Sequence, residues 1–526
     1  MARVGAMITE PAQSEPPSVT KPTAKQPVGQ LTSDVGHSIR NALKLGMGLL
    51  GSWAVALLIR LALPRFLGIS LFGELQFADA FTTTVFVVII LGVETYARRE
   101  IATRREHASD FVGGTLVIGL VIGAIAMAVA LASLNAAGKS QRVLELVFIL
   151  GIAQMLTNIN ALFAALLHAV GKVDGLSYLQ VGSKLAWGLG IAIALALGYG
   201  VLGVAFAMLG SELLRIVGLV ILSRRNVGLL FKIDLPATWK VIVTSFPFYV
   251  GGVAQIMYAK IDVSIMSFLT TDREVGWYGA ASTLAGISLL LSPLISWVLL
   301  PLSTRAALRS EDELMTVAKR SMELILVLAF PVTLFLGVGA EFIITAAFGA
   351  QFAPAEHSLR ILAPTFILTY AAIVTATLLV RMGRGWAVTW TSVAGMFLAP
   401  ALNLFLVPRC FARFGPGGAG IGAAISLTLT ELFTAGVMTY LLGMHAFDRR
   451  SVVALLKTLA CGVLVVIADQ VLRFNGIGAW RLLLDGLLYV TAVTISGALD
   501  VRGGIALARS AMESRSQKAA AEGAGA

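Results

Sequence analysis

The feature that most constrains this chain is a succession of apolar runs, each about as long as a membrane is thick. A helix needs about 20 apolar residues to cross the hydrocarbon core of a bilayer. The run at 111–134, "FVGGTLVIGLVIGAIAMAVALASL", contains no charged residue. Such runs predict membrane-spanning helices, because a membrane β-barrel would show segments of about ten residues with alternating polarity.

Repeating this search along the chain predicts an all-α polytopic membrane protein with about fourteen transmembrane helices. The spans are expected near 43–63, 73–97, 111–134, 143–168, 177–197, 200–222, 241–266, 276–300, 322–348, 358–381, 386–407, 418–443, 453–472 and 481–500.

Composition supports the membrane assignment. Hydrophobic residues make up 57% of the chain and charged residues 13%, with a mean hydropathy of +0.86, whereas soluble domains carry about 25% charged residues. The net charge of +11 comes from short basic clusters between apolar runs. This arrangement disfavours a nucleic-acid partner, which would need one basic stripe. Cys410 and Cys461 stand alone, so neither a metal site nor a disulfide framework is predicted.

The ends and the loops predict an orientation. Residues 1–35 are rich in Pro, Ser, Thr and Gln and lack the apolar core of a signal peptide, so we expect a disordered tail there and another at 504–526. Lys and Arg concentrate in the loops after even-numbered spans, as in "RRE" at 98–100. Positive loops stay in the cytoplasm, which places both termini there.

The chain also repeats itself. Gly73 in "LFGELQFADA" matches Gly276 in "EVGWYGAAST", and the segment from Gly203 to Glu212 matches that from Gly422 to Glu431. Spans 1–6 therefore correspond to spans 7–12, and an even number of helices per unit relates the halves by an axis along the membrane normal. We expect two six-helix lobes at 36–225 and 240–445, with helices 13 and 14 added at 450–503.

Four stretches, in order along the chain, carry a family resemblance. They are "LPRFLGISLFGELQFADA" (63–80), "QIMYAKIDVSIMSFLTTDREVGWYGAA" (255–281), "FGAQFAPAEHSLRILAP" (348–364) and "ALNLFLVPRCFARFGPGGAGIGAAIS" (401–426). The ordered set, which covers about residues 40–445, resembles the Wzx-type polysaccharide flippases of the multidrug/oligosaccharidyl-lipid/polysaccharide (MOP) superfamily.

This resemblance implies a function and its setting. A Wzx-type flippase has two six-helix lobes, like a MATE transporter, and moves an undecaprenyl-pyrophosphate-linked oligosaccharide across the bacterial inner membrane by alternating access. It serves exopolysaccharide, capsule or O-antigen synthesis. The implied partners are this lipid-linked glycan, membrane lipid, a polysaccharide polymerase and other assembly proteins. The family supplies no short catalytic motif, so no cofactor and no enzymatic activity are expected, and residue roles rest on physical reasoning.

Basic residues inside spans are the first site candidates. A pyrophosphate held away from water needs compensating charge and hydrogen-bond donors, which Arg and Lys provide. A basic residue facing lipid would be costly, so these side chains are expected to point into the bundle. The alternative is that these long side chains extend to the membrane interface, and this alternative is favoured for Arg381. The candidates are Arg60, Lys184, Arg215, Lys260 and Arg381.

Acidic residues inside spans are the second set. They could couple transport to an ion, or simply pair with a local base. Glu212 and Arg215 lie one helical turn apart and are expected to pair. Lys260 and Asp262 do not share a helix face, and Glu431 has no base within its span, which makes it the stronger coupling candidate. The full set is Asp79, Glu94, Glu212, Asp262 and Glu431.

Aromatic residues near span ends, among them Trp277 and Tyr278, are expected at the membrane interface.

Three other functions remain open. A drug/cation antiporter of the same superfamily would prefer an acidic cavity, whereas this chain offers buried bases. A flippase for a lipid-linked peptidoglycan precursor fits the bases but resembles the chain less. A membrane-embedded glycosyltransferase or polymerase needs a large loop with paired catalytic carboxylates, and the loops here are short.

Overall fold

The computed structural model describes residues 28–89, 92–101, 104, 107–291, 303, 309–443, 449–475, 478 and 480–497. All regular structure within these ranges is helical. Residues 1–27 and 504–526 of the predicted tails lie outside the described residues, as do residues 292–300 of the eighth predicted span.

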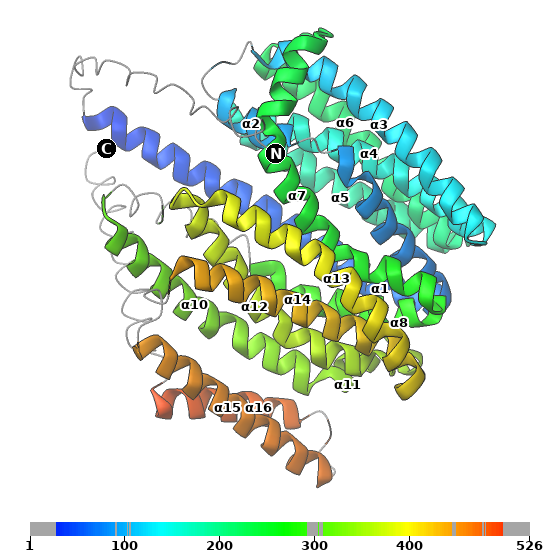
Figure 1. The fold of residues 1–526 in the computed structure, drawn as a ribbon, viewed down its shortest axis with the longest axis vertical. Coiled ribbons are helices and arrows are strands. Elements are labelled where there is room, and N and C mark those ends of the chain that lie inside the picture. Colours follow the sequence, from blue (N-terminus) through cyan, green and yellow to red (C-terminus); the bar gives the residue numbers. More distant parts are fainter. Residues whose placement is uncertain are drawn as a thin grey trace, which may run out of the picture.

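The elements follow one another along the chain as labelled in Figure 1. The first half contains α1 (Val28–Phe86), η1 (Val87–Ile89), α2 (Val93–Glu100), α3 (Ala108–Ala136), α4 (Gln141–Ala169), α5 (Val173–Ala196) and α6 (Gly200–Val227). The second half contains α7 (Leu235–Leu269), α8 (Asp272–Ala285), η3 (Gly286–Leu291), α10 (Glu311–Val338), α11 (Ala340–Phe348), η4 (Ala350–Phe352), α12 (Ala355–Arg381), α13 (Gly385–Phe414) and α14 (Gly418–Leu442). A hairpin of α15 (Arg449–Phe474) and α16 (Arg481–Ser496) follows.

Nine helices of the described chain are long and apolar enough to cross a membrane, and the bent pair around Gly339 would make ten. Large apolar side chains such as Leu120, Ile125 and Val129 on α3 are exposed. Lipid is the solvent that tolerates such a surface. The helical membrane fold is thus confirmed, while the count of fourteen stays a prediction.

The structure differs from the predicted spans and tail in three places. The loop expected between the first two spans is helical, and only a kink at Gly68 (φ 73°, ψ 174°) separates the two halves of α1. Glycine has no Cβ to clash at this positive φ, so the chain can turn without a loop. The ninth predicted span is bent by 76° between α10 and α11. In addition, α1 begins at Val28, inside the segment predicted as a tail.

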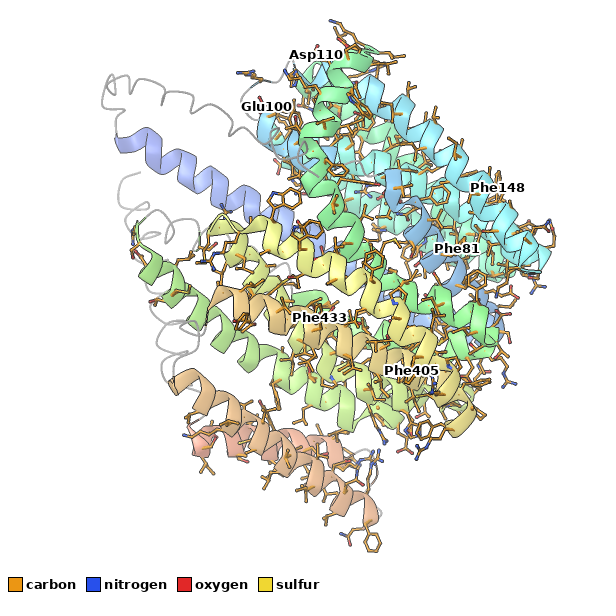
Figure 2. The ribbon with its side chains drawn as sticks, viewed as in Figure 1. Phe81, Glu100, Asp110, Phe148, Phe405 and Phe433 are labelled. Atoms are coloured by element: carbon orange, nitrogen blue, oxygen red, sulfur yellow. The ribbon has the colours of Figure 1, made fainter. Side chains whose placement is uncertain are left out.

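Helix packing groups α1–α6, here called the N-terminal lobe, and α7–α14, the C-terminal lobe. The domain boundaries at 36–225, 240–445 and 450–503 stay predictions. Helix α7 contacts both groups: a Cβ added to Gly92, the N-cap residue of α2, would lie 2.6 Å from the Ser245 carbonyl oxygen of α7. Further along α7, Tyr258 faces Gly395 on α13. The contact at Gly92 therefore links the lobes at the end of the bundle where α2 and α7 begin, near the labelled Glu100 and Asp110 (Figure 2).

At the opposite end the lobes meet along a seam between α1 and α8, which Figure 1 shows close to α11. A Cβ added to Gly73 would lie 1.9 Å from the Asp272 carbonyl oxygen, and one added to Gly276 would lie 2.2 Å from the Ile69 carbonyl oxygen. A shift of 203 residues carries Ile69 to Asp272 and Gly73 to Gly276, so it converts each of the two contacts into the other. The same spacing separates Gln76 from Gly279, to whose carbonyl oxygen the Gln76 amide donates. A contact that maps onto itself in this way marks a two-fold axis. The pseudo-two-fold axis of the repeat therefore passes through this helix crossing.

Polar and aromatic contacts extend the seam. The Lys139 ammonium donates to the Ser267 carbonyl and hydroxyl oxygens at 2.6 and 2.9 Å. It also lies over the rings of Phe77 and Phe268. Burial lowers the pKa of Lys139, and the carboxylate of Asp272 offsets part of that effect. These contacts join the α3–α4 turn to the end of α7, so the seam is closed across both lobes.

We predict that Gly73→Ala opens the seam. The new methyl group would collide with a backbone oxygen, which cannot rotate away, and overpacking of about 1–3 kcal/mol shifts a closed–open equilibrium by about fivefold or more. The measurement is the maleimide labelling rate of Thr283→Cys in a protein whose two native cysteines are replaced. Gly182→Ala, which has open space around it, is the matched control. An unchanged labelling rate in Gly73→Ala would contradict the prediction.

Candidate functional site

The N-terminal lobe contains a buried carboxylate with partners on two helices. Glu212 on α6 is only 5% exposed. The side-chain amide of Asn160 on α4 donates to its Oε2 at 2.8 Å and to its backbone oxygen at 3.2 Å. Arg215 Nη1 lies 3.6 Å from the same Oε2. Glu212 and Arg215, expected from their spacing to pair, thus lie within ion-pair distance.

Lys184 on α5 extends this group. The electrostatic interactions of its ammonium include those with Glu212, Arg215, Arg60 and Asp79. The ammonium also lies 5.2 Å from the ring centroid of Trp187. Helices α1, α5 and α6 thus bring together three basic side chains and two carboxylates, which we call the N-lobe cluster: Arg60, Asp79, Lys184, Glu212 and Arg215.

The side chains of the N-lobe cluster differ in their exposure. Arg60 is exposed, Lys184 and Arg215 are half-buried, and Glu212 is buried. Because a lone buried charge is costly, Glu212 holds its neighbours in place while the basic groups remain reachable. A cluster of this kind can accept an anion, since Arg and Lys offer both charge and several donors.

Lys260 and Asp262 lie on α7, in the C-terminal lobe. Asp262 is buried and accepts hydrogen bonds from the hydroxyl of Tyr278 on α8 and from the Val263 backbone N–H. Lys260 is half-buried and interacts electrostatically with Asp262. Tyr278 and Trp277, which were expected at the membrane interface, are both buried in the bundle and not exposed to lipid. The hydroxyl of Tyr278 instead donates a hydrogen bond to Asp262, which offsets the free-energy cost of burying that carboxyl group.

Glu431 on α14 is buried inside the C-terminal lobe, with 5% exposure. Thr369 on α12 hydrogen-bonds to it, while its Oε2 has no hydrogen-bond partner. Tyr258 of α7 lies near enough for an electrostatic interaction. No ion pair of Glu431 occurs among the residues that the structure describes. A buried carboxylate without an ion-pair partner is costly at such a place.

The remaining candidates are peripheral. Glu94 forms an ion pair with Arg98 one turn along α2, and it lines a small cavity of about 80 Å³ together with Thr115 and Asn158. Arg381 is exposed in the last turn of α12, as the interface alternative predicts.

Sequence reasoning did not find Asn160, Tyr278 or Thr369 as partners of the buried acids. An Asn within an apolar run was the available signal, because such a side chain seeks a partner on another helix. Within the described residues no group of three or more His, Cys, Asp or Glu side chains could hold a metal ion.

Comparison with known proteins relates this architecture to transporters. A family model described as "Polysaccharide biosynthesis protein" matches residues 38–307. The "Probable low-salt glycan biosynthesis flippase Agl15" of Haloferax volcanii is 24% identical over 187 residues, which cover 35% of this chain and 39% of that relative. The match thus spans well under half of the relative's length.

Solved structures show the same fold. The structure titled "Lipid II flippase MurJ, inward closed conformation" matches with a TM-score of 0.69 at 14% identity, covering 88% of this chain and 99% of that one. An inward-facing multidrug resistance MATE family transporter of the MOP superfamily matches with a TM-score of 0.56 at 15% identity, covering 74% and 98%. At such identities the likeness concerns the fold alone.

We predict that Glu212→Ala destabilises the protein while Glu212→Gln has a smaller effect. Alanine leaves Asn160 without an acceptor and the basic groups without their central carboxylate, and breaking a buried pair costs about 3 kcal/mol. Glutamine keeps an oxygen for Asn160. Thermal unfolding of the purified protein in detergent measures both variants, and equal melting temperatures for the two would contradict this assignment.

Proposed function

Because the chain belongs to the polysaccharide biosynthesis protein family, we propose that it is a flippase for a lipid-linked glycan. The substrate is an undecaprenyl-pyrophosphate-linked oligosaccharide, moved across the bacterial inner membrane for exopolysaccharide, capsule or O-antigen synthesis. Both termini lie in the cytoplasm, and a polysaccharide polymerase with other assembly proteins receives the product. The protein works as a transporter and not as an enzyme.

The observation that carries this proposal is the N-lobe cluster. It contains three basic side chains and two carboxylates, so its formal net charge is positive and it can attract an anionic headgroup. Glu212 occupies the buried side, and Arg60, Lys184 and Arg215 offer donors on the accessible side. A pyrophosphate displaces their water and forms charge-assisted hydrogen bonds instead. Lys260 and Arg381, which lie elsewhere, are assigned no direct headgroup contact in this proposal.

The seam between α1 and α8 supports alternating access. It closes the bundle at one end through backbone contacts at Gly73 and Gly276. By the distribution of Lys and Arg this end faces away from the cytoplasm. A headgroup bound at the N-lobe cluster can leave on the side away from the cytoplasm only when the seam opens. A closed seam therefore prevents uncontrolled passage of the substrate between the two sides of the membrane.

We predict that Lys184→Ala and Arg215→Ala reduce glycan export by about tenfold or more, since a hydrogen bond to a charged group contributes about 1.5–3 kcal/mol. Lys184→Arg should retain most export. Lys240→Ala, an exposed base at the start of α7, is the control. Deleting the gene should make a lipid-linked intermediate accumulate on the cytoplasmic leaflet. Loss of the variants from the membrane, or normal export by them, would contradict the assignment.

Ion coupling completes the proposal. Glu431 lacks an ion-pair partner in the described part of the chain and is enclosed by α7, α12 and α14. It takes up a proton or cation in one state of the cycle and releases it in the other. Asp79, Glu94, Glu212 and Asp262 each have a polar or basic neighbour and act in charge pairing.

We predict that Glu431→Gln, which keeps a hydrogen-bonding side chain of the same size but removes the charge, uncouples export from the ion gradient. Uptake of a fluorescent lipid-linked glycan by membrane vesicles, with and without an imposed proton or sodium gradient, measures this effect. Glu356→Gln, which removes a half-buried carboxylate paired with Arg360 in the first turn of α12, should respond like the wild type. A persistent gradient response in Glu431→Gln would refute the role.

The second candidate is a drug/cation antiporter, which the buried carboxyl group of Glu431 favours. An antiporter of this class would expel cationic dyes from vesicles in exchange for protons. Dye efflux without any effect of gene deletion on lipid-linked glycans would decide for this candidate.

A further inference from the structure

The C-terminal lobe contains a groove of about 680 Å³ at the seam end of the bundle. Three connections that are distant in the sequence surround it. They are the start of α8 with Thr271 and Arg273, the η4 segment with Gln351, and the α13–α14 turn with Pro416. Pockets of about 300–1,000 Å³ are typical of small-ligand sites.

The groove is preformed, because side chains beneath it join its walls. Glu274, which is 2% exposed, accepts hydrogen bonds from the backbone N–H groups of Gly417 (2.7 Å) and Ala419 (3.1 Å). The indole N–H of Trp277 donates to the Gln351 backbone oxygen at 3.0 Å. Gly417 (φ 84°) packs closely on the carbonyl of Pro354. These bridges fix α8 to both other connections, so little ordering is needed when a ligand binds.

The lining combines apolar faces with exposed hydrogen-bonding groups. Phe411, Pro354 and Pro416 supply apolar surface. Arg273, whose guanidinium lies 5.4 Å from the ring centroid of Trp277, is exposed together with Gln351 and Thr271. Arg273 has no ion pair among the described residues. Sugars present apolar ring faces edged by hydroxyl groups, and this lining is complementary to both.

The groove also borders the seam. Asp272, between the lining residues Thr271 and Arg273, packs its carbonyl against Gly73 of α1. Phe352, next to Gln351, packs on Phe72 of α1 with ring centroids 6.5 Å apart. Two walls of the groove are therefore the same segments that close the seam. A glycan that leaves between the lobes passes directly beside the groove.

We propose that this groove binds the oligosaccharide part of the lipid-linked substrate as it emerges from the seam. The inference rests on the proposed flippase function and adds a second contact to it, separate from the headgroup contact at the N-lobe cluster. Arg273, Gln351 and Thr271 donate to or accept from sugar hydroxyl groups, and the apolar walls contact the ring faces.

The test uses the full-length protein in lipid nanodiscs and an array of free oligosaccharides from bacterial cell-surface polysaccharides. The wild type should bind at least one of them. The double variant Arg273→Ala/Gln351→Ala should bind it at least tenfold more weakly, and Ala350→Trp, which fills the groove without removing a contact, should do the same. Arg413→Ala, which removes an exposed arginine outside the lining, should bind like the wild type.

Two results would overturn the inference: no binding to any oligosaccharide by the wild type, or unchanged binding by both groove variants. Melting temperatures confirm that the variants are folded. Failure of the proposed function gives a different result, because gene deletion would then leave lipid-linked glycans unchanged whatever the array shows.

Discussion

A charge placed inside a bilayer must find a partner, and this requirement organises the interior of the protein. Glu212 is held by Asn160 and Arg215, and Asp262 by Tyr278. Each pair joins the carboxyl group to a donor that the surrounding lipid cannot supply. Glu431 is the contrasting case, with one oxygen unpartnered. In the proposed function the hydrogen-bonded acids stabilise the fold, whereas Glu431 binds and releases an ion.

The second organising feature is the glycine crossing on the pseudo-two-fold axis. Gly73 and Gly276 let α1 and α8 touch through their backbones, as small residues do between membrane helices. Such a contact has no side chains that could adjust gradually, so the lobes are either in contact or apart. Lys139 and its aromatic neighbours strengthen the closed state from the turn beside the crossing.

In the proposed function, the three regions together outline a route for an anionic, sugar-bearing lipid. The N-lobe cluster offers charge to the headgroup, the seam controls exit, and the groove offers polar and apolar contacts at the far side. The groove is built by the segments that close the seam. Its occupancy and the opening of the seam are thereby physically linked, since movement of α8 shifts both.

The sequence alone determined the helical membrane fold, because lipid demands long apolar runs with internally paired backbones. It also predicted the Glu212–Arg215 pair, since residues three apart share a helix face whatever surrounds them. The internal repeat placed Gly73 opposite Gly276 in the alignment but could not reveal that they touch. It likewise missed the helical Gly68 kink, where the pattern predicted a loop.

Only the tertiary structure decided which helices meet. It brought Arg60 and Glu212 within electrostatic range of Lys184, and it chose Asn160, Tyr278 and Thr369 as partners of buried acids. It also assembled the groove from three distant turns. The physical reason is that helical periodicity fixes neighbours within about one turn. Contacts between helices depend instead on how all side chains pack at once, which no local pattern encodes.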